Sequence, residues 1–453
     1  MRQSLFDTLP PGPVPGSTAF AGVGTEHARP AVDVAALATL LTQRIELPSW
    51  AFRGSDPRFS SYVAAGAPRS VYELLADAAA VHRFTGITPR IGLHQPTDRV
   101  DDYADLAAHA AELGVCIGSV HPEVNQRHGR PPALCHPDDA VRRRAMDQLR
   151  NGAEVAATVG ADQLVLRFVD DSPYPGHGET RARQARLGEA LAVLRSELAA
   201  GIALLIEYSM VEPCFYTQDV PDWGTAFAQC LALGPDARVL LDTTHYAQAT
   251  TVDHVVAYLL ADGRLGGLVV RSPTPGDVLG TPLGGGGAPG APEPTAAFDL
   301  FLTLSEIALG GGVVRGRELP APFVLDPGAN RFPGILPLVR AVLAVQEATA
   351  RATQLDQAAW WAAQENGDHL AANEVLLAAY EADVEPLLGA VRTAMGVPRD
   401  PEEAYHELCR TEHRESERRA ALQRLVARRV AGLLGPHGGT AWASQSPPAS
   451  QPA

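Results

Sequence analysis

The chain has 453 residues and a formal net charge of −15, with 46% hydrophobic and 20% charged residues. This balance is typical of a globular protein, and the negative charge argues against nucleic-acid or anionic-membrane binding, which needs a cationic surface. The five cysteines are scattered without a CxxC pair, which indicates a reducing compartment and no structural zinc cluster. The N-terminus lacks the apolar core of a signal peptide, and no run approaches the roughly 20 apolar residues of a membrane helix. We therefore expect a cytoplasmic protein.

Apolar runs alternate with amphipathic segments from about residue 40 onward. The apolar runs predict eight strands, at 44–50, 90–94, 116–122, 163–169, 202–208, 238–244, 266–272 and 321–326. The amphipathic segments predict helices at 70–86, 101–114, 138–159, 179–199, 222–233, 252–262, 296–308 and 335–352. Eight such units in roughly 300 residues favour an α/β fold, a (β/α)₈ TIM barrel. A doubly wound open sheet is the alternative, although no glycine-rich phosphate fingerprint follows the first strand.

Four segments organise the chain in this interpretation. Residues 1–35 form a disordered or irregular N-terminal segment, and residues 36–352 form the barrel domain. Residues 353–434 are helical in pattern and form an extension, and residues 435–453 are a low-complexity tail.

Polar residues gather where the predicted strands end, which in a TIM barrel is the face that carries the active site. Three carboxylates end the fifth, sixth and eighth strands, namely Glu207, Asp242 and Asp326. Three histidines end or follow the second, third and sixth strands, namely His94, His121 and His245. Trp50 ends the first strand, and it either faces a sugar or closes the barrel mouth by packing.

Carboxylates that share one mouth repel each other unless a cation lies among them. Oxygen ligands with one imidazole suit Mn²⁺, Mg²⁺ or Co²⁺ better than zinc. The pattern thus predicts a divalent metal site, with Mn²⁺ as our first choice. A single acid at a strand end can instead cap the next helix, so the prediction depends on Glu207, Asp242, His245 and Asp326 acting together.

Longer stretches resemble the L-rhamnose isomerase-like sugar isomerases of the xylose-isomerase TIM-barrel superfamily. They include "IELPSWAF…RF", "LLIEYSMVEPCFYTQDVPDWGTA" and "LLDTTHYA", and the resemblance covers about residues 40–408. It implies two metal ions bridged by Glu207, with Asp242 and Asp326 on one ion and His245 on the other. It implies catalytic roles for His94, His245 and Glu207, and sugar binding by Trp50, Phe59 and His94. We add Arg167 as a substrate-binding candidate because of its guanidinium group. It also implies that the arm 355–408 reaches a neighbouring subunit in a homotetramer.

The chain departs from that family's pattern at several site positions. Val269 stands where the family has a metal-binding histidine, and Ser209 where it has a lysine that polarises the substrate oxygens. Thr97 and Arg167 replace aromatic residues, and Arg271 adds a positive charge close to Val269. Of the acidic loop that supplies two further ligands, only Asp277 is present, within "GDVLG".

Two functions are compatible with these residues. One is metal-dependent aldose–ketose isomerisation of a monosaccharide by hydride shift. The other is a degenerate barrel that binds a sugar or sugar phosphate without isomerising it, or a repurposed enzyme, because guanidinium groups pair well with phosphate or carboxylate. The retained ligands favour the first function, and the lost histidine and lysine favour the second.

Overall fold

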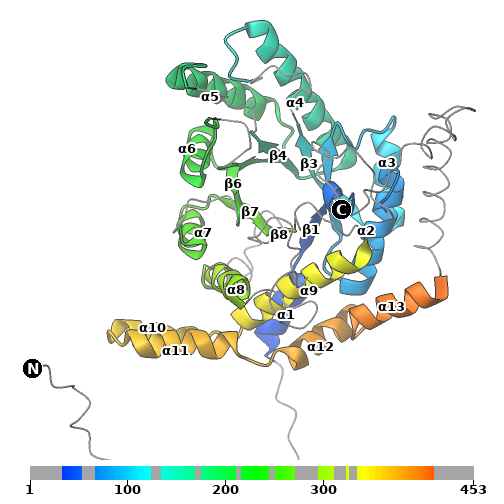
Figure 1. Cartoon of the computed structure of the whole chain (residues 1–453), viewed down its shortest axis with the longest axis vertical. Helices are drawn as coiled ribbons and strands as arrows, with labels where there is room; N and C mark the ends of the chain where they lie inside the picture. The colour runs from blue at the N-terminus through cyan, green and yellow to red at the C-terminus, as the bar shows by residue number, and fades with distance from the viewer. Residues whose placement is uncertain are drawn as a thin grey trace, which may run out of the picture.

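Eight parallel strands close into a barrel in chain order, with β1 hydrogen-bonded to both β2 and β8 (Figure 1). The computed structural model describes residues 33–53, 67–123, 134–168, 175–210, 216–243, 250–270, 294–310, 323–325 and 334–412. The strands are β1 (Ile45–Pro48), β2 (Arg90–Gln95), β3 (Cys116–Pro122), β4 (Gln163–Arg167), β5 (Ala203–Glu207), β6 (Ala237–Asp242), β7 (Leu265–Val270) and β8 (Phe323–Leu325). The predicted TIM barrel is confirmed.

Helices follow the strands and surround the barrel (Figure 1). They are α2 (Val71–Thr85), α3 (Tyr103–Glu112), α4 (Asp139–Val159), α5 (Thr180–Glu197), α6 (Trp223–Leu233), α7 (Val252–Ala261), α8 (Pro294–Leu309) and α9 (Ile335–Ala352). Their starts are set by local chemistry, since the Ser70 hydroxyl accepts from the amide of Glu73 at 3.2 Å, which caps α2. Gly86 ends α2 with a φ of 75°, a conformation that favours glycine.

Side chains alternate along each strand between the helices and the barrel interior. Outward residues such as Leu204 and Ile206 of β5 join the large core between sheet and helices. On the β4–β7 side, the interior is filled by a separate apolar cluster of Val165, Leu205, Leu240 and Val269. This cluster forms the floor beneath the polar ends of β4, β5 and β6.

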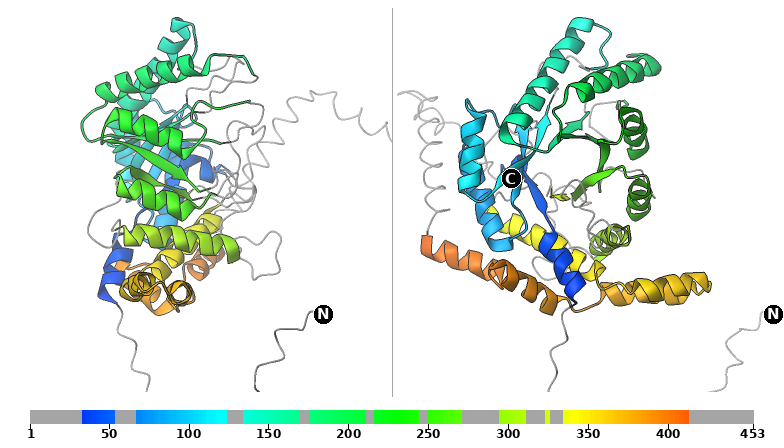
Figure 2. Two further views of the ribbon diagram at one scale, coloured as in Figure 1. Left: turned by 90° about the vertical axis from the view of Figure 1, so that its left-hand side faces the viewer. Right: turned by 180° about the vertical axis from the view of Figure 1, so that it is seen from behind.

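The extension consists of α10 (Gln357–Glu365), α11 (His369–Tyr380), α12 (Glu385–Met395) and α13 (Pro401–Glu412). It runs along one edge of the barrel, and Figure 2 shows it from the side and from behind. The helix α1 (Val34–Thr42) packs against α12 and α9 through a small apolar cluster that includes Leu40 and Leu388. We did not predict this helix, although Asp33 caps it by accepting from the amide of Ala35 at 2.9 Å.

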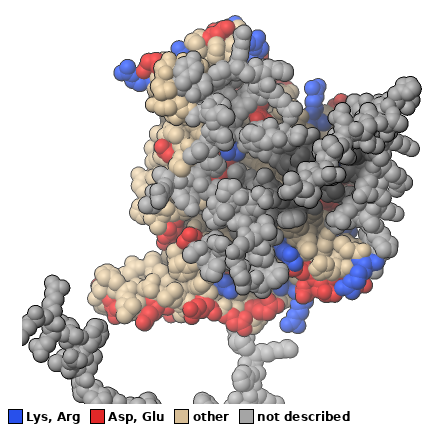
Figure 3. Space-filling view, viewed as in Figure 1, with Lys and Arg blue, Asp and Glu red and all other residues tan. Residues whose placement is uncertain are grey.

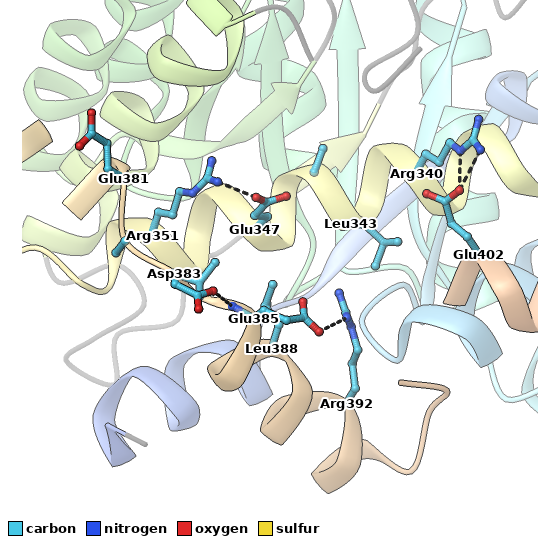
Figure 4. A pocket seen from close by; sticks show the side chains of 13 residues that line it. Arg340, Leu343, Glu347, Arg351, Glu381, Asp383, Glu385, Leu388, Arg392 and Glu402 are labelled. Carbon is cyan, nitrogen blue, oxygen red and sulfur yellow. Dashed lines mark hydrogen bonds and ion pairs between the residues drawn. The ribbon is translucent and has the colours of Figure 1, made fainter. Parts of the chain in front are cut away.

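A charged cleft separates α9 from the extension (Figure 4). Arg340 of α9 pairs with Glu402 of α13 at 2.8 Å, whereas Arg351 pairs with Glu347 on α9 itself at 2.7 Å. The first pair fastens the extension to the barrel domain. Among the described helices, none is long and apolar enough to cross a bilayer.

Candidate functional site at the barrel mouth

The structure describes five of the nine predicted site residues, and all five lie at the ends of β-strands or just beyond. These are Trp50, His94, Arg167, Glu207 and Asp242. Four others, together with Arg271, fall outside the described residues: Phe59, His245, Asp277 and Asp326.

Glu207 and Asp242 are the last residues of β5 and β6, and both are buried. Each stands two residues after a member of the interior apolar cluster, Leu205 and Leu240, so strand alternation turns both carboxylates inward. Tyr208 points the other way and donates a hydrogen bond to the carbonyl oxygen of Asp242 at 3.2 Å. Burial raises the pKa of Tyr208, so this phenol stays protonated and supports the end of β6.

Arg167 lies next to Glu207 at the end of β4. Its Nε is 3.7 Å from Oε1 of Glu207, and its Nη2 donates to the hydroxyl of Ser209 at 3.4 Å. The guanidinium therefore offsets part of the negative charge of the buried carboxylates. It also places a permanent cation beside the residue that the family resemblance assigns to both metal ions.

Val269 is the register partner of Asp242 across the β6–β7 pair. It is buried in the interior apolar cluster with Leu240. The position that the resemblance assigns to a metal-binding histidine is thus beside Asp242 and facing inward, and valine supplies no donor atom there.

Trp50 lies in the short 3-10 turn Ser49–Phe52 that follows β1, close to the ends of β2 and β3. Its ring meets the rings of His94 and His121 edge to face, with centroids 5.8 Å and 5.0 Å away. His94 places Nε2 3.3 Å from Glu123 and Nδ1 3.0 Å from the hydroxyl of Thr97. Both nitrogens of His94 therefore have partners, which fixes its ring orientation at the mouth.

A buried polar chain beneath His121 was not predicted from the sequence. Arg90, Glu46 and Ser119 connect the lower end of the barrel interior to the ring of His121. Burial raises the pKa of Glu46, against the opposing effects of Arg90 and Ser119. The signal was present, because Glu46 is a charged residue at an inward position of an otherwise apolar strand.

Glu207 and Asp242 supply the hard oxygen donors that Mn²⁺ or Mg²⁺ prefers, and both face the same interior. The described residues alone contain no group of three or more His, Cys, Asp and Glu that could hold an ion. A complete site would need His245, Asp277 or Asp326 in addition. Glu207 and Asp242 thus supply donor atoms of the type that a divalent ion binds, but two donors alone do not make up a metal site.

Known proteins are similar in sequence to most of this chain. The family model described as "Xylose isomerase-like TIM barrel" matches residues 76–281. A protein named "Probable sugar isomerase" from Rhizobium meliloti (strain 1021) is 29% identical over 381 residues, covering 82% of this chain and 86% of its own length. A second protein of that description, from Mesorhizobium japonicum, is 28% identical over 370 residues, with coverage of 80% and 83%. A solved L-ribulose 3-epimerase has 17% identity and a TM-score of 0.45, covering 75% of this chain and 99% of its own.

These matches support the xylose isomerase-like TIM-barrel superfamily for this chain. The matched range 76–281 contains β2–β7 and therefore includes His94, Arg167, Glu207 and Asp242. The superfamily agrees with the one that the sequence resembled. The more specific likeness to L-rhamnose isomerases stays a prediction.

Proposed function

We propose that the protein is a sugar isomerase that binds a monosaccharide at the barrel mouth and interconverts its aldose and ketose forms. One observation carries the proposal: two buried carboxylates, Glu207 and Asp242, end β5 and β6 at the same barrel mouth as an aromatic and imidazole wall of Trp50, His94 and His121. The relatives named as sugar isomerases, which match along more than three quarters of the chain, support the same reaction class.

The proposed reaction balances within the sugar. A hydride moves between C2 and C1 while the C2 hydroxyl loses a proton and O1 gains one, so no external oxidant is needed. The chain's part is to hold the open form in one orientation, which alone can lower a barrier substantially. Trp50 offers an apolar ring surface to the sugar carbons, and His94, held by Glu123 and Thr97, positions the hydroxyls far from the carbonyl.

We propose one divalent ion, Mn²⁺ or else Mg²⁺ or Co²⁺, held by Glu207 and Asp242 with His245, Asp326 and Asp277. When bound, the ion supplies Lewis-acid polarisation of the sugar oxygens. The positive charge of Arg167 at 3.7 Å from Glu207 favours one ion over two, because a second cation would be repelled.

A non-isomerising sugar- or sugar-phosphate-binding barrel is the second candidate. The apolar packing of Val269 beside Asp242 favours it, since a ligand of the resembled metal site is replaced by a core residue. Arg167 argues against a free phosphate site, because its guanidinium already contacts Glu207 and Ser209.

Metal analysis with ligand screening separates the two candidates. Purified protein equilibrated with manganese should carry one ion per chain, and Glu207→Gln should carry none, because an amide oxygen offsets less of the ion's charge. Glu402→Gln, which alters a carboxylate at the α9–α13 seam, is the matched control and should keep the ion. A panel of free and phosphorylated aldoses is then tested by thermal shift and ketose formation. Stabilisation without ketose, or equal metal in wild type and Glu207→Gln, would favour the binding barrel.

A further inference from the structure

A line of buried polar side chains runs through the barrel interior along β1, β2 and β3. Arg90 donates from Nε to Oε2 of Glu46 at 3.3 Å, and the Ser119 hydroxyl donates to Oε1 of Glu46. The same Ser119 oxygen lies 2.8 Å from Nε2 of His121. Glu46 and Ser119 are both completely buried, so the two hydrogen bonds of Ser119 are shielded from water.

The backbone is shaped to admit this line. A Cβ atom at Gly118 would overlap the Glu46 carboxylate. A Cβ atom at Gly92 would lie 2.9 Å from the Ser119 oxygen and 3.1 Å from Nε2 of His121. Any larger residue at these two positions would displace the chain of hydrogen bonds, so β2 and β3 are built around it.

An apolar interior would be the less costly way to fill this space, because buried charges lose their hydration. The opposite side of the same barrel is filled in that way, by Val165, Leu205, Leu240 and Val269. The polar side ends at His121, which is the register partner of His94 and lies 5.0 Å from the Trp50 ring. The line therefore leads to the wall of the proposed sugar site.

The hydrogen-bond directions determine which nitrogen of His121 carries the proton. The Arg90 guanidinium, 3.3 Å away, opposes the effect of burial on the pKa of Glu46, and as the carboxylate of this ion pair Glu46 only accepts. Ser119 gives its single proton to Glu46, so its oxygen must accept from His121 and the ring carries its proton on Nε2. Nδ1 then keeps a lone pair, and within the described part of the chain the ring has no other hydrogen bond.

We propose that His121 is a further substrate-binding residue, whose Nδ1 accepts a hydrogen bond from a sugar hydroxyl, and that Ser119 and Glu46 are positioning residues that fix its tautomer. The ligand class rests on the proposed function, whereas the tautomer does not. Burial lowers the pKa of His121 to about 3, together with the charges of His94 and Arg167. The ring is thus a neutral acceptor throughout the physiological pH range, as recognition of an uncharged polyol requires.

The tautomer is tested on the protein without sugar. The ring nitrogens of ¹⁵N-histidine-labelled protein are observed by NMR, with His121 assigned from its loss in His121→Gln. Wild type should show a neutral ring protonated on Nε2. In Glu46→Gln the proton should instead lie on Nδ1. The amide oxygen of this variant faces Arg90 and its NH₂ group donates to Ser119, so the Ser119 hydroxyl donates to Nε2 of His121. Ser305→Ala, which removes another buried serine hydroxyl on α8, is the control and should change nothing.

A wild-type ring protonated on Nδ1, or the same tautomer in wild type and Glu46→Gln, overturns the positioning role of Ser119 and Glu46.

The sugar contact is tested by calorimetry with D-xylose and L-rhamnose in the presence of manganese. His121→Phe keeps the ring against Trp50, and we expect it to raise Kd by about threefold to tenfold, as loss of one hydrogen bond does. Ser119→Ala should also raise Kd, whereas Ser305→Ala should leave Kd unchanged. An unchanged Kd in both variants overturns the contact. A wild type that binds neither sugar overturns the proposed function and the contact together, and leaves the tautomer result standing.

Discussion

Asp242 lies opposite Val269 across the β6–β7 pair, at the mouth end of both strands. A carboxylate with a predicted role in metal binding therefore has a valine as its neighbour, and that valine belongs to the apolar floor of the barrel. Position 269, where the resembled family has a metal-binding histidine, therefore lies next to the carboxylate of Asp242. A Val269→His substitution would add a donor atom beside that carboxylate.

Restoring the missing groups should raise activity. We expect low wild-type activity on common free aldoses and a clear gain in a Val269→His, Ser209→Lys, Arg271→Asn triple variant assayed with manganese. A lysine directed at developing negative charge is worth on the order of 10²–10³ in rate, by analogy with an oxyanion-hole donor. The chain contains no lysine, so the new amine is the only side-chain amine and its pKa can be followed by ¹³C-methylation NMR. Wild-type turnover at ordinary rates of roughly 1–10³ per second would contradict this.

Removing the guanidinium from the mouth should strengthen metal binding. Arg167→Gln takes away a positive charge 3.7 Å from Glu207, and we expect manganese to bind about tenfold more tightly, since like charges disfavour a shared site. Competition with a fluorescent chelator measures the change. Arg340→Gln, at the α9–α13 seam, should leave the affinity as it is. Weaker manganese binding in Arg167→Gln would mean that the guanidinium supports the site.

Acid should destabilise the fold partly through His121. Its pKa is about 3 in the folded chain and about 6.5 when unfolded, so between these values the unfolded state binds more protons. The free energy of unfolding should fall as pH drops below about 6.5, by up to about 1.4 kcal/mol per pH unit from this residue. Urea unfolding at about pH 7 and about pH 5 measures the slope. His121→Gln should have a smaller slope than wild type, and equal slopes would show that His121 is not the group responsible.

Assembly should depend on the extension. Trp361 of α10 and Leu370 of α11 are 44% and 69% exposed, which leaves apolar surface uncovered on the projecting helices (Figure 1). Figure 3 shows acidic side chains along the lower edge of the molecule. On the same two helices, Glu365 and Glu374 are exposed. We expect a homotetramer by light scattering, and dissociation in a Trp361→Glu, Leu370→Glu variant. Leu231→Glu, on α6, is the control. If the wild type is a monomer at micromolar concentration, residues 355–408 do not act as an arm that holds a tetramer together.

The barrel was predictable because each buried strand is a short apolar run. The predicted strand at 238–244 corresponds to β6 (Ala237–Asp242), and that at 163–169 to β4 (Gln163–Arg167). Boundaries were less predictable, since the strand predicted to reach residue 50 ends at Pro48, where the 3-10 turn begins. The helix α1 was missed because it adjoins a proline- and glycine-rich segment, despite its Asp33 cap.

The site was only partly predictable for a different reason. Strand ends identify Glu207 and Asp242 one residue at a time, but a chain such as Glu46–Ser119–His121 joins three residues of two strands. Hydrogen bonds between residues of different strands depend on the register in which the strands pair. That register is irregular here, because β2 and β3 shift register between Ile91 and Gly92. The contact of Arg167 with Glu207 likewise follows from strand pairing.

The central claim is that Glu207 and Asp242 hold a divalent ion and that the mouth isomerises a sugar. Its most direct test follows C1-¹³C-labelled free and phosphorylated aldoses by NMR, with wild type and Glu207→Gln, in the presence and absence of manganese. The account predicts slow conversion to ketose by wild type that requires manganese, and none by Glu207→Gln. Equal conversion by the two proteins, or no conversion of any aldose by wild type loaded with manganese, would contradict it.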